Sequence, residues 1–287
     1  MALSTDVRHA INDVLRPFNL QIGTLNSARA EESRVQFLIE SGALDRQAFP
    51  LSPGMADFDP GPLAEALKTY EDGLRGLTSG ANAVGFDPNN SYFFGSDMHV
   101  LYLMVRSLRP RRIVEIGCGN STRISRQAIM DGGLETKITA IDPQPRRDIS
   151  AMVDAFEQMR LEEMSNFGVF EALEANDILF VDSSHEVRVG NDVARIFCEI
   201  IPRLKPGVVV HVHDIFLPFD YPANFATAMP EWGEQYVLHA WLQHSGAQVL
   251  WPGRYLQECR PELREPLPFL ADGPGQSFWF RLAENAQ

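Results

Sequence analysis

Short apolar segments alternate with helix-like segments from about residue 96 onwards, and this alternation constrains the fold more than any other feature of the chain. The composition of the apolar segments predicts buried strands at residues 112–116, 137–141, 177–181, 208–212, 248–251 and 277–282. The segments around them predict helices at residues 98–108, 121–130, 192–204 and 235–244. Because parallel strands need crossover connections, which helices usually supply, the pattern indicates an α/β fold with helices on both faces of a mostly parallel sheet. A Pro-rich loop joins the last two strands, which suits an antiparallel edge of the same sheet.

The first ninety residues follow a different pattern. Apolar residues at helical spacing predict a short amphipathic helix over residues 6–18, and Pro17 limits its extent. Residues 48–62 contain four prolines, which favours an extended connector, and a second helix is predicted from 62 to 77. We therefore expect residues 1–90 to form an N-terminal helical arm with its connector, and residues 91–287 to form the main domain.

Charge and composition exclude several classes of partner. The chain has 25 basic and 38 acidic residues, and its net charge of -13 would repel a nucleic-acid backbone or an anionic membrane. No run approaches the roughly 18 apolar residues that a membrane span requires. Cys118, Cys198 and Cys259 are odd in number and far apart, which fits a reducing, cytoplasmic setting better than a disulfide framework. The N-terminal arm favours packing on the main domain or in a homo-oligomer.

The loop VEIGCGNST at residues 114–122 follows the first predicted strand. Gly117 and Gly119 permit a close approach of the backbone to a ligand, although a tight turn between a strand and a helix also needs glycine. A dinucleotide-binding loop would have a third glycine where this chain has Thr122. Asp142 ends the next strand, where a carboxylate can accept hydrogen bonds from two ribose hydroxyls or simply open a surface turn.

Together, the glycine loop and the strand-terminal AIDP segment resemble the S-adenosylmethionine site of class I methyltransferases. The resemblance extends over roughly residues 90–282 and implies a Rossmann-like seven-stranded sheet with an antiparallel C-terminal edge. It implies that Gly117, Cys118 and Gly119 pass under the methionine part of the cofactor. It also implies that Glu115 supports the loop and that Asp142 holds the ribose. The other cofactor contacts predicted on this basis are Tyr92, Asn120, Ser121, Asp182 and Ser183.

A second group of polar residues follows two later strands. Asp182 and His185 come after the strand at 177–181, and His213 and Asp214 come after the strand at 208–212. Because adjacent parallel strands end at the same edge of a sheet, these four side chains are predicted to converge. Each residue alone would also suit a cap, a turn or a surface position. His211 shares the strand face of His213 and is expected to be a hydrogen-bonded core histidine.

This second group is similar to the site of metal-dependent sugar O-methyltransferases of macrolide and aminocoumarin pathways. That resemblance implies that Asp182 binds a metal, that His185 is a general base and that Asp214 completes the metal site. His213 stands where the family has an acidic residue. Imidazole favours a softer metal than magnesium, so the predicted ligands Asp182, His213 and Asp214 suit manganese or zinc as well as magnesium, or no metal. The predicted catalytic residues are His185, Asp182 and His213.

The segment at residues 177–222 also resembles methyltransferases associated with bacterial surface-polysaccharide synthesis. This resemblance implies methyl transfer from S-adenosylmethionine to a hydroxyl of a sugar or glycan, or of a glycosylated small molecule. Three alternatives stay open at this point: a hydroxylase-like enzyme of the same fold, a nicotinamide dehydrogenase, which Thr122 disfavours, and a non-catalytic cofactor-binding assembly protein. Formation of S-adenosylhomocysteine would separate the transferase from the two other enzymes. An assembly protein would bind the cofactor, and His185→Ala would change nothing in cells.

Overall fold

The computed structural model describes residues 5–23, 25–273 and 275–283, and these form two compact units. The smaller unit comprises residues 1–46 and 221–230, and the larger one comprises residues 47–220 and 231–287, in each case as far as they are described. The outer ends of the two predicted domains, residues 1–4 and 284–287, lie outside the described residues.

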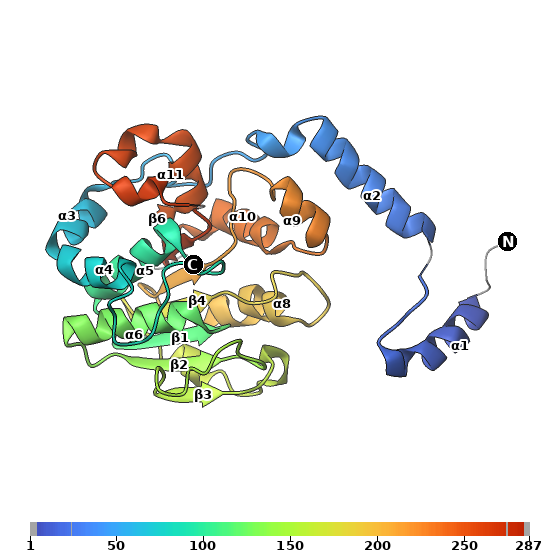
Figure 1. Cartoon of the computed structure of the whole chain (residues 1–287), viewed down its shortest axis with the longest axis horizontal. Coiled ribbons are helices and arrows are strands. Elements are labelled where there is room, and N and C mark those ends of the chain that lie inside the picture. Colours follow the sequence, from blue (N-terminus) through green and yellow to red (C-terminus); the bar gives the residue numbers. More distant parts are fainter. Residues whose placement is uncertain (1–4, 24, 274, 284–287) are drawn as a thin grey trace. The chain divides into compact units, whose positions relative to one another are not determined.

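The larger unit contains a seven-stranded sheet, which confirms the predicted α/β fold (Figure 1). Its strand order is β3-β2-β1-β4-β5-β7-β6. The first five strands of that order are parallel, whereas β7 runs antiparallel to both β5 and β6 and forms the predicted C-terminal edge. The strands are β1 (Arg112–Ile116), β2 (Lys137–Ile141), β3 (Ala155–Glu157), β4 (Ile178–Val181), β5 (Val209–Val212), β6 (Gln248–Pro252) and β7 (Phe278–Arg281).

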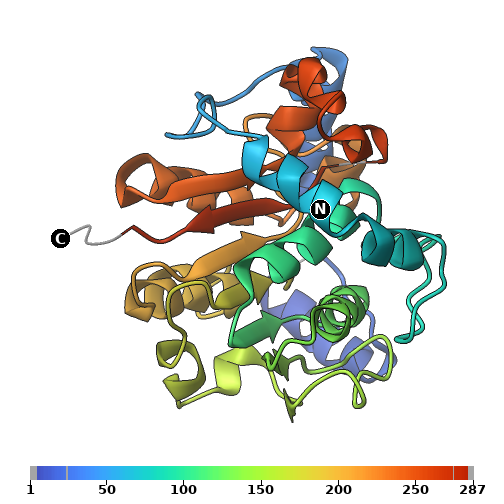
Figure 2. The same cartoon turned by 90° about the vertical axis from the view of Figure 1, so that its left-hand side faces the viewer.

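The register of the central strands sets the position of the site. Ile116 of β1 pairs with Val181 of β4, and Val181 pairs with Val212 of β5, so the three strands end at the same level. Figure 2 shows these strands side by side, with β7 in red between the orange β5 and β6. The residues that follow β1, β4 and β5 therefore meet at one edge of the sheet.

Helices flank the sheet, and most were predicted within a few residues. The differences have physical reasons. The predicted helix at 192–204 is split into α-, π- and 3₁₀-helical parts, the last of which contains Pro202. The three-residue β3 was not located because it is short and only partly buried. The main helices are α5 (Gly95–Leu108), α6 (Asn120–Gly132), α8 (Asp192–Arg195), η4 (Ile196–Ile200), η5 (Ile201–Arg203), α10 (Glu234–Ser245) and α11 (Gly253–Cys259).

Residues 47–90 belong to the larger unit, so the units divide between Arg46 and Gln47 and not near residue 90. The helix predicted at 62–77 is two helices, α3 (Gly61–Thr69) and α4 (Glu71–Thr78). α3 contacts α5, and α4 contacts α6. Their apolar residues are buried in the core of this unit, which explains why this part of the predicted arm is not separate; they are Leu63, Ala66, Leu74 and Leu77.

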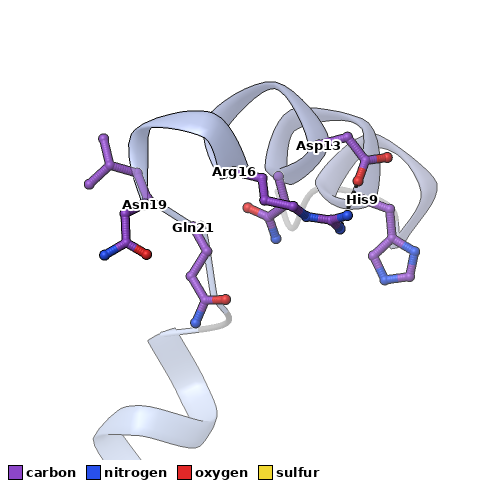
Figure 3. A pocket seen from close by; sticks show the side chains of 7 residues that line it. His9, Asp13, Arg16, Asn19 and Gln21 are labelled. Carbon is purple, nitrogen blue, oxygen red and sulfur yellow. Dashed lines mark hydrogen bonds and ion pairs between the residues drawn. The ribbon is translucent and has the colours of Figure 1, made fainter. Parts of the chain in front are cut away.

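The smaller unit is helical. It contains α1 (Thr5–Leu15), η1 (Arg16–Phe18), α2 (Leu25–Glu40), η2 (Ala43–Asp45) and α9 (Ala223–Ala228). A polar pocket lies along α1 and the turn after it, where Arg16 pairs with Asp13 at 3.0 Å (Figure 3). Val14 and Phe18 are 69% and 71% exposed, so part of the apolar face predicted for this helix is not buried within the smaller unit. Over residues 5–23, 25–273 and 275–283, no helix has the length and apolarity for crossing a membrane.

Candidate active site

The loop after β1 approaches the end of β4 so closely that Gly117 has no room for a side chain. Gly117 has φ +77°, and a Cβ there would lie 1.8 Å from the carbonyl oxygen of Asp182. A Cβ on Gly119, by contrast, would meet no atom within 4 Å. One glycine thus permits close packing inside the protein, and the other leaves one side of the loop open to a ligand.

Glu115 holds this loop from beneath, as predicted. Its carboxylate accepts hydrogen bonds from the hydroxyls of Ser121 at 2.5 Å and Thr122 at 2.7 Å. The Thr122 hydroxyl in turn accepts the Gly119 N–H at 2.9 Å, which gives a structural reason for threonine at this position. Burial raises the pKa of Glu115 to about 7, although both hydrogen bonds favour its charged form.

Asp142 joins the end of β2 to the glycine loop. One carboxylate oxygen accepts the Cys118 N–H at 3.0 Å, and the other accepts the Gln144 N–H at 2.7 Å. The Cys118 thiol also donates to the first of these oxygens, at 3.4 Å. A carboxylate has about four acceptor positions, so one position remains available for a ribose hydroxyl. Burial raises the pKa of the Cys118 thiol, with further contributions from Glu115 and Asp142, so this thiol is neutral and not a nucleophile.

A pocket lies above the glycine loop and contains most of the predicted cofactor residues. Three predicted residues, Glu115, Gly117 and Asp142, lie outside this lining and shape the loop through the contacts described above. Ser183 is not in the lining either, and its hydroxyl is buried with no hydrogen-bond partner among the described residues. The lining residues are Tyr92, Phe93, Cys118, Gly119, Asn120, Ser121, Arg146, Arg147 and Asp182.

Three residues of this lining were not predicted: Phe93, Arg146 and Arg147. The Arg146 guanidinium lies 4.9 Å from the ring centre of Tyr92, which joins the segment before α5 to the segment after β2. The two arginines follow the turn that begins at Asp142. Their place in the chain, directly after a predicted ribose-binding residue, was a signal that could have indicated them.

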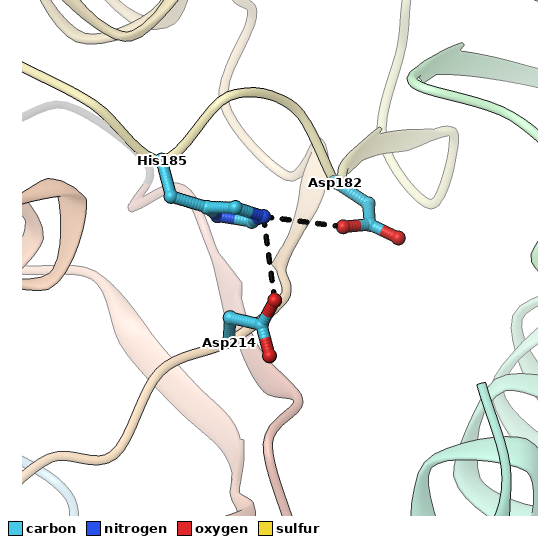
Figure 4. Close-up of side chains that lie close together, drawn as sticks. All are labelled: Asp182, His185 and Asp214. Carbon is cyan, nitrogen blue, oxygen red and sulfur yellow. Dashed lines mark ion pairs between the residues drawn. The ribbon is translucent and has the colours of Figure 1, made fainter. Parts of the chain in front are cut away.

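The predicted convergence after β4 and β5 is present. His185 Nε2 lies 3.4 Å from Asp182 Oδ1 and 3.3 Å from Asp214 Oδ2 (Figure 4). One ligand atom from each of these three residues lies within 4.8 Å of the others, a spacing that suits a shared metal ion. Asp182 also lines the pocket above the glycine loop, so this three-residue group and that pocket are adjacent.

His213 lies beside this group. Its Nδ1 is 3.6 Å from Asp214 Oδ1 and 3.8 Å from Asp182 Oδ1, and its Nε2 is 3.4 Å from Asp97 Oδ2. His185 is therefore nearer than the predicted ligand His213 to both central carboxylates. His211 lies in the core as expected, fully buried and 3.0 Å from the Ser277 hydroxyl.

Glu234, at the start of α10, was not predicted. One of its carboxylate oxygens lies 2.9 Å from His185 Nδ1, and its side chain has no exposed surface. The indole ring of Trp232 contacts the His185 ring, with the ring centres 4.4 Å apart. Glu234 follows His185 by 49 residues and begins an ordinary amphipathic helix, so no sequence pattern indicates this contact.

The carboxylates determine the charge of both histidines. Burial alone would lower the pKa of His185, but Asp182, Glu234 and Asp214 outweigh it and raise that pKa to about 10. Burial likewise opposes the charged form of His213, but Asp214 and Asp182 raise its pKa well above the usual value. Both imidazoles are therefore protonated at neutral pH in this arrangement, and a protonated His185 is not a general base. The predicted base role requires a state in which this imidazole is neutral.

Two of these residues have unusual backbone conformations. His185 has φ 60° and Asp214 has φ 55°, both in the left-handed region that favours glycine. Such conformations cost of order 1–3 kcal/mol each and persist where the surrounding structure enforces them. They occur here at two of the three residues that converge in Figure 4.

The donor set of Asp182, His185 and Asp214 fits a divalent cation. Two carboxylates and one imidazole suit manganese, iron or zinc better than magnesium, which prefers oxygen ligands alone. The Glu234 contact to Nδ1 leaves Nε2 facing the carboxylates, which is the usual arrangement of a metal-binding histidine.

Comparisons with known proteins are consistent with this fold. Residues 114–215, from β1 to just beyond β5, match a family model described as a methyltransferase domain. No curated protein matches the chain.

Several solved structures show a weak similarity. The O-methyltransferase from Bacillus cereus in complex with SAH is 16% identical, over 76% of this chain and 91% of that chain, with a TM-score of 0.40. TomG from Streptomyces achromogenes, an O-methyltransferase in complex with SAM, is 16% identical over 86% and 96%, also with a TM-score of 0.40. The chain spans 62% of the cmcI-D160 Mg-SAM structure, at 17% identity and a TM-score of 0.34. Similarities of this size do not bear on activity. The match of residues 114–215 to a methyltransferase-domain model and the strand order of the sheet agree with the predicted resemblance to class I methyltransferases.

Proposed function

We propose that this protein transfers a methyl group from S-adenosylmethionine to a hydroxyl of a sugar or glycan, with a divalent cation held by Asp182, His185 and Asp214. One observation supports this proposal above the others. The three-residue group lies at the ends of β4 and β5, and its member Asp182 also lines the pocket above the glycine loop. A donor site and a site that activates an acceptor are therefore adjacent.

The donor side is formed by the chain between β1 and the turn after β2. Gly119 leaves the space that a bound ligand needs, and Glu115 keeps the loop in place through Ser121 and Thr122. Asp142 retains acceptor capacity for a ribose hydroxyl. This division of roles predicts that changes at Asp142 or Glu115 alter the affinity for the donor.

On the acceptor side, the difficulty is the weak nucleophilicity of an alcohol at neutral pH. When bound, a divalent cation supplies Lewis acidity that lowers the pKa of an alcohol. Asp182 and Asp214 would hold the cation with their carboxylates, and His185 with Nε2. The protonated His213 pairs with both carboxylates and keeps them oriented. Placing the hydroxyl next to the donor methyl then supplies proximity, which contributes much of the acceleration in reactions of this type.

The general-base role of His185 is an alternative to metal ligation, because both use Nε2 while Nδ1 faces Glu234. Three carboxylates surround His185 here and stabilise its protonated form. Metal ligation requires the deprotonated nitrogen, so a cation and the second proton compete for Nε2. The sugar or glycan acceptor is supported by two resemblances of the sequence: that of the residues after β4 and β5 to sugar O-methyltransferases, and that of residues 177–222 to methyltransferases of surface-polysaccharide synthesis.

The proposal is tested with the purified full-length chain, labelled S-adenosylmethionine and a panel of sugar-containing acceptors. Acceptor-dependent formation of S-adenosylhomocysteine and of a labelled methyl ether is the expected result. Activity should disappear in a chelator and return with manganese, zinc or magnesium. Full activity in the chelator would refute the metal, and the absence of S-adenosylhomocysteine with every acceptor would count against the transferase.

A further inference from the structure

The geometry points to Glu234 as a positioning residue that holds the His185 ring so that Nε2 faces Asp182 and Asp214. This inference deepens the proposed function, and its chemical consequence, a metal or a proton at Nε2, rests on that function. The contact between Glu234 and His185 is present in the described chain whether or not the proposed function holds. Glu234 is the first residue of α10, and its side chain is fully buried.

The start of α10 holds both the ring and the backbone of His185. The carboxylate of Glu234 lies 2.9 Å from Nδ1. The backbone N–H groups of Gly233 and Glu234 donate to the His185 carbonyl oxygen at 2.8 Å and 3.2 Å. His185 has a left-handed φ, which persists only where neighbouring groups enforce it, and residues 233–234 provide that enforcement.

The same helix start is also tied to the chain after β5. The side-chain oxygen of Gln235 accepts the Phe216 N–H at 3.0 Å. Phe216 lies two residues after Asp214. Glu234 and Gln235 therefore connect α10 to the two segments that carry the candidate metal ligands, one after β4 and one after β5.

Glu234 has no other described partner that would explain its burial. Its second carboxylate oxygen is buried and has no hydrogen-bond partner among the described residues. A buried carboxylate is costly unless it is paired, and the group that pairs with it here is His185. A carboxylate that accepts the Nδ1–H of a histidine fixes the ring orientation and leaves Nε2 as the nitrogen available for a metal or a proton.

A spectroscopic experiment distinguishes a Glu234 that positions the His185 ring from a Glu234 that only stabilises the fold. The full-length chain is labelled with ¹⁵N, and the His185 Nδ1–H proton is followed in wild type, E234Q and E234D. A second buried carboxylate provides the matched control, because E115Q alters the glycine loop and not the contacts of His185. Each protein is also titrated with Mn²⁺ alone and with S-adenosylhomocysteine alone.

In wild type, we expect a downfield Nδ1–H resonance that is protected from exchange with water. E234D, whose side chain is too short to reach Nδ1, should lose this resonance, and E234Q, which offers an uncharged amide oxygen as acceptor, should shift it upfield. Both variants should bind Mn²⁺ roughly 10–100-fold more weakly, with unchanged affinity for S-adenosylhomocysteine. E115Q should show the opposite: an intact resonance, unchanged Mn²⁺ affinity and weaker binding of S-adenosylhomocysteine.

An E234Q protein with the wild-type resonance would overturn the inference. So would an E234Q protein that loses Mn²⁺ and S-adenosylhomocysteine binding to the same extent, because general loss of structure has that effect. Wild-type protein that binds no Mn²⁺ would refute the metal part of the proposed function. The resonance would then decide the role of Glu234 without reference to a metal.

Discussion

Gly117 and Asp182 are in direct backbone contact: a Cβ on Gly117 would lie 1.8 Å from the Asp182 carbonyl oxygen. Gly117 begins the loop below the pocket, and Asp182 belongs to the three-residue group with His185 and Asp214. The donor side and the acceptor side of the proposed site therefore share a rigid backbone junction. A side chain at Gly117 would have to separate them.

We expect G117A to disrupt this junction and to lower the affinity for S-adenosylhomocysteine by at least about 10-fold, since binding depends on the loop geometry. G133A is the matched control. Gly133 also has a positive φ, 54°, but a Cβ there would meet no atom within 4 Å. G133A should lower the free energy of unfolding by about 1 kcal/mol and leave the affinity for S-adenosylhomocysteine unchanged. Equal affinities for the two variants in a calorimetric titration would contradict the importance of the contact.

Replacing Asp142 should weaken donor binding. D142N removes the charge that strengthens hydrogen bonds to the Cys118 N–H and to a ribose hydroxyl, and such charge-assisted bonds contribute about 1.5–3 kcal/mol. We expect an affinity for S-adenosylmethionine that is roughly 10–100-fold lower. Asp148 lies in the same connection, is exposed and accepts the Ser150 N–H at 2.9 Å, so D148N is the control and should bind like wild type.

Glu115 should make stability depend on pH. Its pKa in the folded state is about 7, above the ordinary value of 4.5, so between these values the folded chain holds a proton that the unfolded chain has lost. The free energy of unfolding should therefore fall as pH rises from 4.5 to 7. The contribution of this group to that fall is about 3 kcal/mol, at about 1.4 kcal/mol per pKa unit.

Urea denaturation of wild type and E115Q at several pH values measures this contribution. E115Q has no titrating group at this position, so its stability should fall less steeply over the same range. Parallel pH profiles for the two proteins would show that Glu115 keeps an ordinary pKa.

Asp97 should be important for folding. Its two carboxylate oxygens accept the N–H groups of Ser277 at 3.0 Å and Gln276 at 3.1 Å, and it lies 3.4 Å from His213 Nε2. D97N removes one partner of a buried charged pair, and we expect it to lower the free energy of unfolding by about 3–5 kcal/mol. Asp87, which is exposed and accepts one N–H of the next loop, supplies the control D87N. If D97N and D87N unfold at the same urea concentration, the buried pair of Asp97 and His213 does not contribute to the free energy of unfolding.

The central sheet could be predicted from sequence because its strands are buried on both faces. β1 and β2 have the predicted bounds, and β4 differs by one residue. The short, partly exposed β3 carries little apolar signal, and the sequence around it did not indicate a strand. The boundary predicted near residue 90 depends on the prolines of residues 48–62, which look like a linker, whereas Met55 and Phe58 of that segment are buried in the core.

The candidate site, like the fold, could be predicted only in part. Asp182, His185, His213 and Asp214 could be brought together because strand ends in a parallel sheet meet, which is a rule of topology. Glu234 and Asp97 reach the same histidines from helices, and the path of a helix over a sheet is set by tertiary packing. The charge of His185 follows from those partners, so its protonation could not be read from the chain.

The left-handed backbone at His185 and Asp214 has a consequence for sequence comparison. Glycine suits these conformations better than histidine or aspartate does, so folding alone favours glycine there. Relatives that keep the fold but have lost the reaction should drift toward Gly at these two positions. Retention of His and Asp there, against the backbone preference, would mark the relatives in which the reaction is still under selection.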